Sequence, residues 1–330
     1  MTQKLQFNLI GVMILAVSLT LGACQPKNQT SENELIPTRL TLGYIPNIQF
    51  APVYVAIEKG YFAEANFDVH LEYGNEADAV ALVGAGEQTF AIASGEQVLL
   101  ARAHELPVIY VAAWYQDYPV GVASLTESRI VVPENLKGVS VGIPGLYGAS
   151  YIGFVALLNA GGLTEADVNL HAIGFNQVEA LVTGQVQSAV VYLANEPVVL
   201  RAQGYPVDVI QVSDYLQLVS NGLVTNEETV RKNPEMASAF IDALLKGLAD
   251  TYKNPIEAYE ISKNFVENLA DADAAVQYEI LAESIKLYQT ERPGYTEPAG
   301  WINMQDVLMD MGLLEEAQNL DEAFTNDLLP

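Results

Sequence analysis

Aromatic and amide side chains follow two of the predicted strands, at positions suited to holding a flat ring. Tyr44 ends the first strand, Asn47 and Phe50 follow it, and Trp114 and Tyr115 follow a later strand. An aromatic face can stack on a planar molecule and add about 0.5–1.5 kcal/mol beyond burial alone, and an amide can both donate and accept hydrogen bonds. Because Trp114 and Tyr115 are neighbours, we expect one to face a ligand and the other to face the core, and the sequence leaves open which.

Two glutamates stand where a predicted strand gives way to a helix. Ser94 and Glu96 begin one such helix. Ser94 can either cap free backbone amides or bind a ligand, and a Glu96 that faces a cleft can accept a hydrogen bond from a ring N–H. Asn195 and Glu196 come just before a helix predicted to begin at Pro197. That position suits a helix cap and equally suits polar recognition of a heterocycle, so all four residues are candidate contacts.

A glycine-rich turn joins another strand to a helix at residues 142–151. Backbone N–H groups exposed at such a turn bind oxygen atoms, whether carbonyl or anionic. Tyr147 and Tyr151 lie on this turn and are candidate contacts, as are Phe175 and Tyr192 at the ends of two further strands. The glycine spacing G-x-x-G-x-x-G differs from the dinucleotide and P-loop fingerprints. The G-x-S-x-x-G that follows is one residue too long for a nucleophile elbow.

An alternation of strands and helices positions these candidate contacts. Short β-branched runs predict strands at residues 40–44, 69–73, 90–93, 108–113, 139–143, 168–173, 189–192 and 207–212. Helical stretches separate them, which is typical of parallel strands joined by helical crossovers. After residue 226 the apolar spacing is mostly helical. The pattern predicts an α/β protein.

The α/β pattern occurs as two analogous units, which predicts two lobes. We expect lobe one at residues 39–125 and 222–330 and lobe two at residues 126–221. The two crossing segments, near residues 124–126 and 220–225, would form the hinge. Ligands in open α/β sheets bind at the carboxyl ends of the strands, so two facing lobes create one cleft between them.

The N-terminus has the pattern of a secretory signal. Lys4 precedes an apolar run at residues 9–21, and small residues lead to Cys24. The run Leu-Gly-Ala-Cys resembles the bacterial lipobox, whose cysteine is lipidated and becomes the first mature residue. The alternative is an ordinary signal peptide that contains a cysteine. We therefore predict a signal peptide at residues 1–23 and a lipid-anchored polar tether at residues 24–38.

Composition narrows the possible partners. The chain has 41 acidic and 15 basic residues, with a net charge of −26. This charge disfavours nucleic acid and anionic ligands and favours a neutral or cationic one, although acidity also simply maintains solubility. Cys24 is the only cysteine, and His70, His104 and His171 are isolated along the chain. We therefore expect neither a metal site nor a cofactor.

The segment at residues 43–62 reads Gly-Tyr-Ile-Pro-Asn-Ile-Gln-Phe-Ala-Pro-Val-Tyr-Val-Ala-Ile-Glu-Lys-Gly-Tyr-Phe. It resembles the NMT1/THI5-like family of periplasmic binding proteins, and the resemblance runs over nearly the whole mature chain. The resemblance implies a type II periplasmic-binding-protein fold, two α/β lobes joined by a two-strand hinge. It also implies an ABC permease as partner and an extracytoplasmic location.

The resemblance also bears on the ligand. Residues 43–52, 142–151 and 218–223 are similar to riboflavin-binding lipoproteins of the family, so riboflavin is the first expectation. A thiamine pyrimidine precursor is the alternative. The matching region of the family places an acidic residue on the pyrimidine ring, which makes Glu196 the first acidic candidate. Some eukaryotic members synthesise that pyrimidine with a cysteine-rich motif that the mature chain lacks, so we expect a receptor rather than an enzyme. Nitrate and sulfonate receptors share the fold but bind anions.

Overall fold

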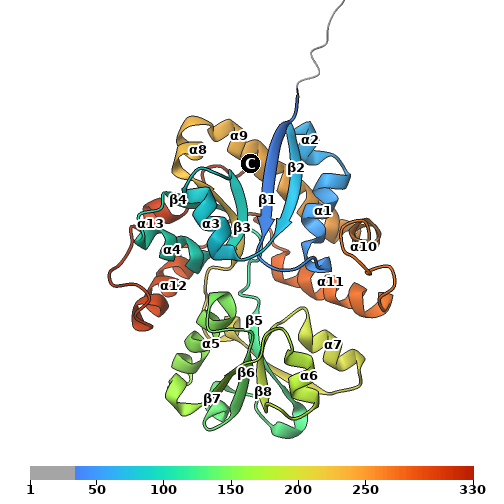
Figure 1. The fold of residues 1–330 in the computed structure, drawn as a ribbon, viewed down its shortest axis with the longest axis vertical. Coiled ribbons are helices and arrows are strands. Elements are labelled where there is room, and N and C mark those ends of the chain that lie inside the picture. The colour runs from blue at the N-terminus through green and yellow to red at the C-terminus, as the bar shows by residue number, and fades with distance from the viewer. Residues whose placement is uncertain (1–33) are drawn as a thin grey trace, which may run out of the picture. The chain divides into compact units, whose positions relative to one another are not determined.

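Two five-stranded sheets organise the computed structural model, which describes residues 34–330 (Figure 1). The first sheet contains β1 (Ile36–Leu42), β2 (Phe67–Tyr73), β3 (Phe90–Ser94), β4 (Val108–Ala113) and β10 (Asn221–Asn226). The second contains β5 (Val120–Leu125), β6 (Ser140–Ile143), β7 (Asn169–Ala172), β8 (Ser188–Tyr192) and β9 (Val207–Gln211). Their spatial orders are β2-β1-β3-β10-β4 and β7-β6-β8-β5-β9. In each sheet one strand, β10 or β5, runs antiparallel between its two neighbours.

Helices surround both sheets. The first sheet carries α1 (Ala51–Glu58), α2 (Tyr61–Glu64), α3 (Glu76–Gly84), α4 (Gly95–Ala103), α8 (Glu227–Lys232), α9 (Pro234–Lys253), α10 (Pro255–Ser262), α11 (Ala274–Tyr288), α12 (Pro298–Asp310) and α13 (Leu320–Ala323). The second carries α5 (Gly148–Ala160), α6 (Gln177–Val182) and α7 (Glu196–Ala202). Short 3-10 helices are η1 (Ile48–Phe50), η2 (Thr126–Ser128), η3 (Pro133–Leu136), η4 (Glu165–Asp167) and η5 (Val212–Asp214). Asn75 starts α3, because its side-chain oxygen accepts hydrogen bonds from the first backbone N–H groups of that helix.

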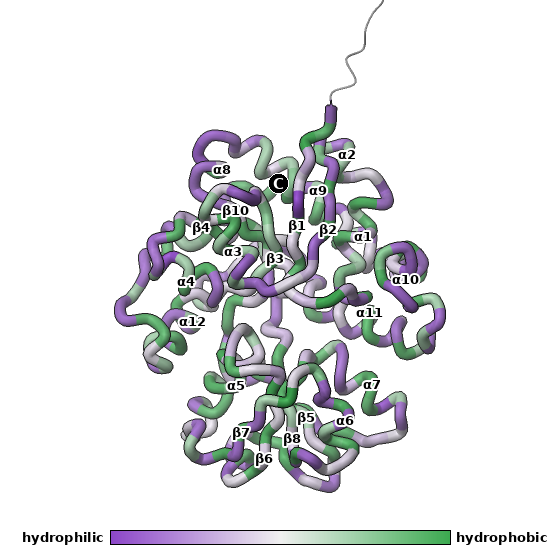
Figure 2. Tube along the Cα trace, in the orientation of Figure 1, coloured by the Kyte–Doolittle hydropathy of each residue, from purple (hydrophilic) through white to green (hydrophobic). Residues whose placement is uncertain are grey.

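Three neighbouring strands of the first sheet, β3, β10 and the edge strand β4, are covered on both faces. Every residue of β3, β4 and β10 is buried. Strands of this kind read as continuous apolar runs rather than alternating ones, because helices pack on both sides of the sheet. Figure 2 shows hydrophilic residues gathered on outer segments such as α8. Because these three strands are buried along their length, a ligand can reach them only near their ends.

Each sheet with its helices is one lobe, and the chain passes between the lobes twice. The first lobe is built from both ends of the described chain, and the second from its middle, coloured green to yellow in Figure 1. The linking segments are residues 114–119, between β4 and β5, and residues 212–220, between β9 and β10. The bilobal α/β fold predicted from the sequence is confirmed.

The predicted hinge positions are wrong in detail. We expected residues up to 125 in lobe one, but β5 pairs with β8 and β9 in the second sheet. The segment expected to cross near residues 220–225 is β10, a central strand of the first sheet. Both segments are antiparallel strands with buried apolar residues, and a pattern of alternating strands and helices gives no signal for such strands.

The N-terminal predictions fall mostly beyond the structure. The predicted signal peptide (1–23), Cys24 and the tether up to residue 33 lie outside the described residues. The tether was predicted to extend to residue 38, but β1 already begins at Ile36 and pairs with β2 along its length. Among the described residues, no helix is both long and apolar enough to cross a bilayer.

Candidate functional site

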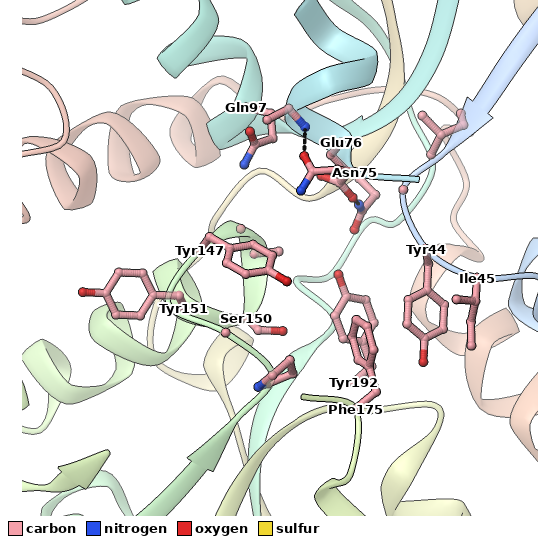
Figure 3. Close-up of a pocket in the computed structure, with 18 of the residues that line it drawn as sticks. Tyr44, Ile45, Asn75, Glu76, Gln97, Tyr147, Ser150, Tyr151, Phe175 and Tyr192 are labelled. Atoms are coloured by element: carbon pink, nitrogen blue, oxygen red, sulfur yellow. Dashed lines mark hydrogen bonds between the residues drawn. The ribbon is translucent and has the colours of Figure 1, made fainter. Parts of the chain in front are cut away.

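A cavity of about 650 Å³ lies between the two lobes. This volume is within the range of small-molecule sites. The first lobe lines it with residues after the ends of β1, β2 and β4, and the second lobe lines it with residues after β6, β7 and β8. Figure 3 shows Glu76 and Gln97 above Tyr147 and Tyr192, with Tyr44 beside Phe175 and Tyr192. The site therefore sits at the carboxyl ends of strands from both sheets.

Most of the predicted contacts line this cavity. They are Tyr44, Phe50, Trp114, Tyr115, Tyr147, Tyr151, Phe175, Tyr192, Asn195 and Glu196. They lie at or shortly after strand ends, or at the starts and in the first turns of helices. The two facing lobes thus bring together aromatic residues that are far apart in the sequence.

The wall from the first lobe is closely packed. Phe50 meets Trp114 edge-on, with ring centroids 5.9 Å apart. The Tyr115 hydroxyl donates to Gln49 Oε1 at 3.4 Å. Trp114 and Tyr115 are only 2% and 7% exposed, and both line the cavity while packing in the core. Our expectation that only one of them faces the cavity is wrong, because β4 ends at Ala113 and strand alternation no longer applies to the link that follows.

The wall from the second lobe is more open. Tyr147 and Phe175 are 63% and 60% exposed. Tyr44 of the first lobe contacts Phe175 edge-on at 5.2 Å, so one aromatic pair spans the two lobes. Gly148 begins α5 with a φ of 66°, a conformation that favours glycine. The backbone then presents the helix start to the cavity, as the glycine-rich turn predicted.

Glu196 is the acidic residue of the second lobe that lines the cavity. Its Oε2 accepts from the backbone N–H of Tyr192 at 2.9 Å, and its Oε1 accepts from Asn195 Nδ2 at 3.1 Å. Burial raises the pKa of Glu196, while these donors oppose the rise. Burial, and to a smaller extent the nearby Glu196 charge, raises the pKa of Tyr44 to about 12. Tyr44 is therefore a neutral hydroxyl at physiological pH.

Three predicted contacts are not among the lining residues. Asn47 caps η1 instead, because its Oδ1 accepts from the backbone N–H of Gln49 at 3.0 Å. Ser94 and Glu96 are fully buried behind the cavity wall. Ser94 also makes no helix cap, since its hydroxyl binds the carboxyl groups of Glu76 and Glu96.

Tyr151 lines the cavity, but its hydroxyl is engaged elsewhere. That hydroxyl donates to Glu165 Oε1 at 3.0 Å. Figure 3 shows the ring directed away from Tyr147 and Tyr192. Tyr147 comes just before α5 and Tyr151 lies in its first turn, so their rings point in different directions.

Sequence reasoning missed several polar lining residues, of which Glu76 and Asn221 are the most important. The others are Gln49, Asn75, Gln97, Ser150 and Gln177, together with the aromatic Tyr73. Glu76 and Asn75 come right after β2, and that position at a strand end was a usable signal. Asn221 begins β10, the antiparallel strand that the alternation pattern had no means of predicting.

The second half of the 43–62 motif stabilises the first lobe rather than the cavity. Lys59 Nζ binds Asp250 Oδ2 at 3.0 Å and Glu257 Oε2 at 2.7 Å. The Tyr61 hydroxyl also donates to Asp250. These contacts join the end of α1 to α9 and α10. Tyr54 is buried, stacks on Phe265 and hydrogen-bonds Tyr73, so it contributes to the packing of the first lobe.

The chemistry of the lining residues suits binding. No Lys, Arg or His occurs among them, and all of them lie in the described part of the chain. Glu76 and Glu196 are the only charged side chains there. Residues 34–330 hold no cluster of metal-ligating side chains. The cavity therefore offers stacking surfaces, amide groups and carboxyl oxygens.

Comparisons with known proteins fit this geometry. Residues 47–258 match the model of the family described as NMT1/THI5 like. The chain is 35% identical to the riboflavin-binding protein RibY of Chloroflexus aurantiacus, over 99% of this chain and 98% of that protein. It is 29% identical to a formylaminopyrimidine-binding protein of Halalkalibacterium halodurans, over 93% and 96% of the two chains.

More distant similarities extend to an enzyme and to other receptors. A 4-amino-5-hydroxymethyl-2-methylpyrimidine phosphate synthase of Saccharomyces cerevisiae is 25% identical over 72% of this chain and 74% of its own. The periplasmic aliphatic sulphonate binding protein SsuA from Escherichia coli superposes with a TM-score of 0.71 at 12% identity, covering 88% and 92% of the chains. The chain has the bilobal fold of periplasmic binding proteins and belongs to the NMT1/THI5-like family.

Proposed function

We propose that the protein is the solute-binding component of an ABC importer and that it captures riboflavin in the cavity between its lobes. The observation that carries the proposal is the cavity itself. It is lined by aromatic rings from both lobes and by no basic side chain of the described chain. Riboflavin is an uncharged tricyclic ring with a polyhydroxylated tail, so it needs stacking surfaces for the ring and polar groups for the tail.

The aromatic residues favour a large ring system over a small one. They are Tyr44, Phe50, Tyr73, Trp114, Tyr115, Tyr147, Phe175 and Tyr192, with Tyr151 at the edge. A single pyrimidine would leave many of these faces without a partner. The similarity to RibY over nearly the full chain also supports riboflavin as the first candidate ligand. A pyrimidine precursor is the second candidate, because a formylaminopyrimidine-binding relative matches 93% of the chain.

A receptor role fits better than an enzymatic one. The relatives that match more than 90% of the chain are named as binding proteins, whereas the synthase matches 72%. The lining residues offer amide, hydroxyl and carboxyl groups, and the carboxyl groups accept hydrogen bonds from neighbouring donors rather than activating a nucleophile. In this proposal the closed lobes present the ligand to a membrane permease.

We also propose that Cys24 carries a lipid that anchors the protein outside the cytoplasm. The lipobox-like run before Cys24 supports this proposal. Two or more acyl chains anchor a protein stably to a bilayer. A Cys24→Ser variant should move from the membrane fraction to the soluble fraction of the cells, and a variant that stays in the membrane fraction would rule out this anchor.

The central test measures ligand binding to the full-length protein in detergent. Riboflavin fluorescence should be quenched on titration with protein, because its ring stacks on tyrosine and tryptophan, with a Kd in the micromolar range or tighter. Binding of formylaminopyrimidine without riboflavin binding would reverse the order of ligands. Turnover of either compound into a new product would replace the receptor with an enzyme.

A further inference from the structure

A pair of carboxyl groups in the first lobe shares a single hydroxyl. The Ser94 hydroxyl oxygen lies 2.5 Å from Glu76 Oε2 and also binds Glu96 Oε1. A hydroxyl has one proton to donate, and an ionised carboxylate can only accept. If both carboxyl groups were ionised, one of their two contacts with the Ser94 hydroxyl would contain no proton. One of the two carboxyl groups must therefore be protonated. We call Glu76, Ser94 and Glu96 the carboxyl relay.

The surroundings determine which carboxyl group holds the proton. Glu76 accepts from the Ser94 backbone N–H at 2.9 Å, from the Ser94 hydroxyl and from Asn221 Nδ2 at 2.8 Å. Glu96 is fully buried, and its Oε2 has no hydrogen-bond partner. Apart from the shared hydroxyl, Glu96 Oε1 accepts from Gln97 Nε2 at 3.4 Å, a longer contact than the two that Glu76 receives from the Ser94 N–H and Asn221. Burial raises the pKa of both carboxyl groups, and the closer donors oppose this rise more at Glu76. Glu96 is therefore the protonated carboxyl group and donates to the Ser94 hydroxyl. The Ser94 hydroxyl in turn donates to Glu76, which is the ionised carboxylate.

Glu76 is the member of the relay that a ligand can reach. It is half-buried and lines the cavity, whereas Ser94 and Glu96 lie behind it. Gly43 leaves room for it, since a Cβ at that position would lie 2.1 Å from the Glu76 Cγ. Glu76 Oε2 already accepts two hydrogen bonds, but Oε1 accepts only one, from Asn221. A lone pair of Oε1 remains for a ligand.

A second observation points to a ligand with an N–H donor. Asn221 lines the cavity and is 7% exposed, and its Oδ1 has no hydrogen-bond partner. A buried acceptor without a partner is costly, so such groups commonly mark an absent donor. Asn75 and Gln97 lie beside Glu76 (Figure 3), and their amide groups suit the carbonyl oxygens that flank a ring N–H.

We propose that Glu76 recognises a ring N–H of an uncharged ligand, and that Glu96 is a positioning residue that holds Glu76 through the one-proton relay across Ser94. The proposal rests on the proposed function and names the chemistry by which the same cavity selects its ligand. The same geometry would disfavour an anionic ligand, because Glu76 and Glu196 are the charged groups in the cavity wall.

The relay makes recognition depend on pH. Burial and the neighbouring Glu76 charge raise the pKa of Glu96 to about 7. The other titratable groups facing the pair are the phenols of Tyr110 in β4, Tyr118 in the link and Tyr192 in β8, which burial keeps neutral. Above about pH 7 a second charge appears behind Glu76, and a ligand that displaces water from the cavity makes that charge more costly. Affinity should therefore be highest below this pH and fall above it.

The first test compares riboflavin with riboflavin methylated at its ring N–H. Hydrogen bonds to charged groups contribute about 1.5–3 kcal/mol, so the wild-type protein should bind the methylated compound roughly 10- to 100-fold more weakly. In Glu76→Gln this preference should shrink to a few-fold, and in the control Glu196→Gln it should persist. Loss of the preference in Glu196→Gln alone would assign the N–H to the other lobe and overturn the proposal.

The second test follows riboflavin affinity between pH 5.5 and 8.5, a range chosen to bracket ~7. The affinity of the wild-type protein should fall several-fold across the range, whereas that of Glu96→Gln should stay level, because the amide that replaces the carboxyl group cannot ionise. Parallel profiles for the two proteins would contradict the relay while leaving riboflavin binding intact.

A third measurement needs no ligand. Infrared difference spectra of the full-length protein should show a protonated carboxyl band near pH 6 that loses intensity in Glu96→Gln, and equal intensity in the two proteins would contradict the relay. If riboflavin does not bind at any pH, the proposed function and the N–H acceptor fail together.

Discussion

The two walls of the cavity differ in how much their residues also contribute to the packed interior of the lobes. In the first lobe, Trp114 and Tyr115 line the cavity and also belong to the hydrophobic core, and the carboxyl relay is tied into β3, α3 and β10. In the second lobe, Tyr147 and Phe175 stand exposed on turns after strands. The first lobe therefore holds a preformed half of the site, whereas the second lobe adds, beside the hydrogen-bonded Glu196, exposed rings that are free to meet a ligand.

Truncation of Trp114 should have the largest effect on stability. Trp114 is 2% exposed and packs against Phe50 and Tyr115. Trp114→Ala should lower the free energy of unfolding by about 3 kcal/mol, toward the low end for buried tryptophan because the space opens into the cavity. Urea denaturation of the full-length protein measures it, and Phe175→Ala serves as the matched control, with a change within about 0.5 kcal/mol. An equal loss of unfolding free energy in both variants would contradict the difference between the two walls.

The carboxyl relay should give the first lobe a measurable dependence on pH. Glu96 titrates near 4.5 when unfolded and near 7 when folded, so between these values the folded state binds a proton that the unfolded state lacks. Stability should therefore be greatest at the acidic end of this window and fall as pH rises, by at most ~1.4 kcal/mol per pH unit for one proton.

The difference between wild type and Glu96→Gln isolates this dependence. Burial also raises the pKa of Glu76 and of Glu196, and both act in the same direction on stability. At each of several pH values, the urea midpoint of Glu96→Gln is therefore subtracted from that of the wild type. A difference that does not change with pH would mean that Glu96 holds no proton in the folded protein.

The sequence predicted the aromatic part of the site better than the polar part. Tyr44, Phe50 and Tyr192 follow strands that apolar runs reveal directly, and strand ends meet in a cleft. Asn47 was misassigned because a polar residue before a helix can serve either as a cap or as a contact, and only the fold decides between them.

The relay was harder to foresee because its members come from separate elements. Glu76 begins α3, Ser94 ends β3 and Glu96 lies in α4, while Asn221, which donates to Glu76, begins β10. Their contact depends on β10 running antiparallel beside β3, which pairs Asn221 with Ser94. Local spacing carries no information about that pairing, since residues 94 and 221 are brought together only by the return of the chain from the second lobe.

Truncation of Phe175 should weaken ligand binding with little change in stability, the smallest of the expected effects. Its ring is 60% exposed and touches Tyr44 across the cavity. Phe175→Ala removes a stacking face worth about 0.5–1.5 kcal/mol, so riboflavin affinity should fall by up to roughly 10-fold in a fluorescence titration. Tyr215→Ala is the matched control, because Tyr215 is 42% exposed and does not line the cavity. If both variants bind riboflavin as tightly as the wild type, the exposed wall of the second lobe does not hold the ring, and the closely packed wall of the first lobe must bind it alone.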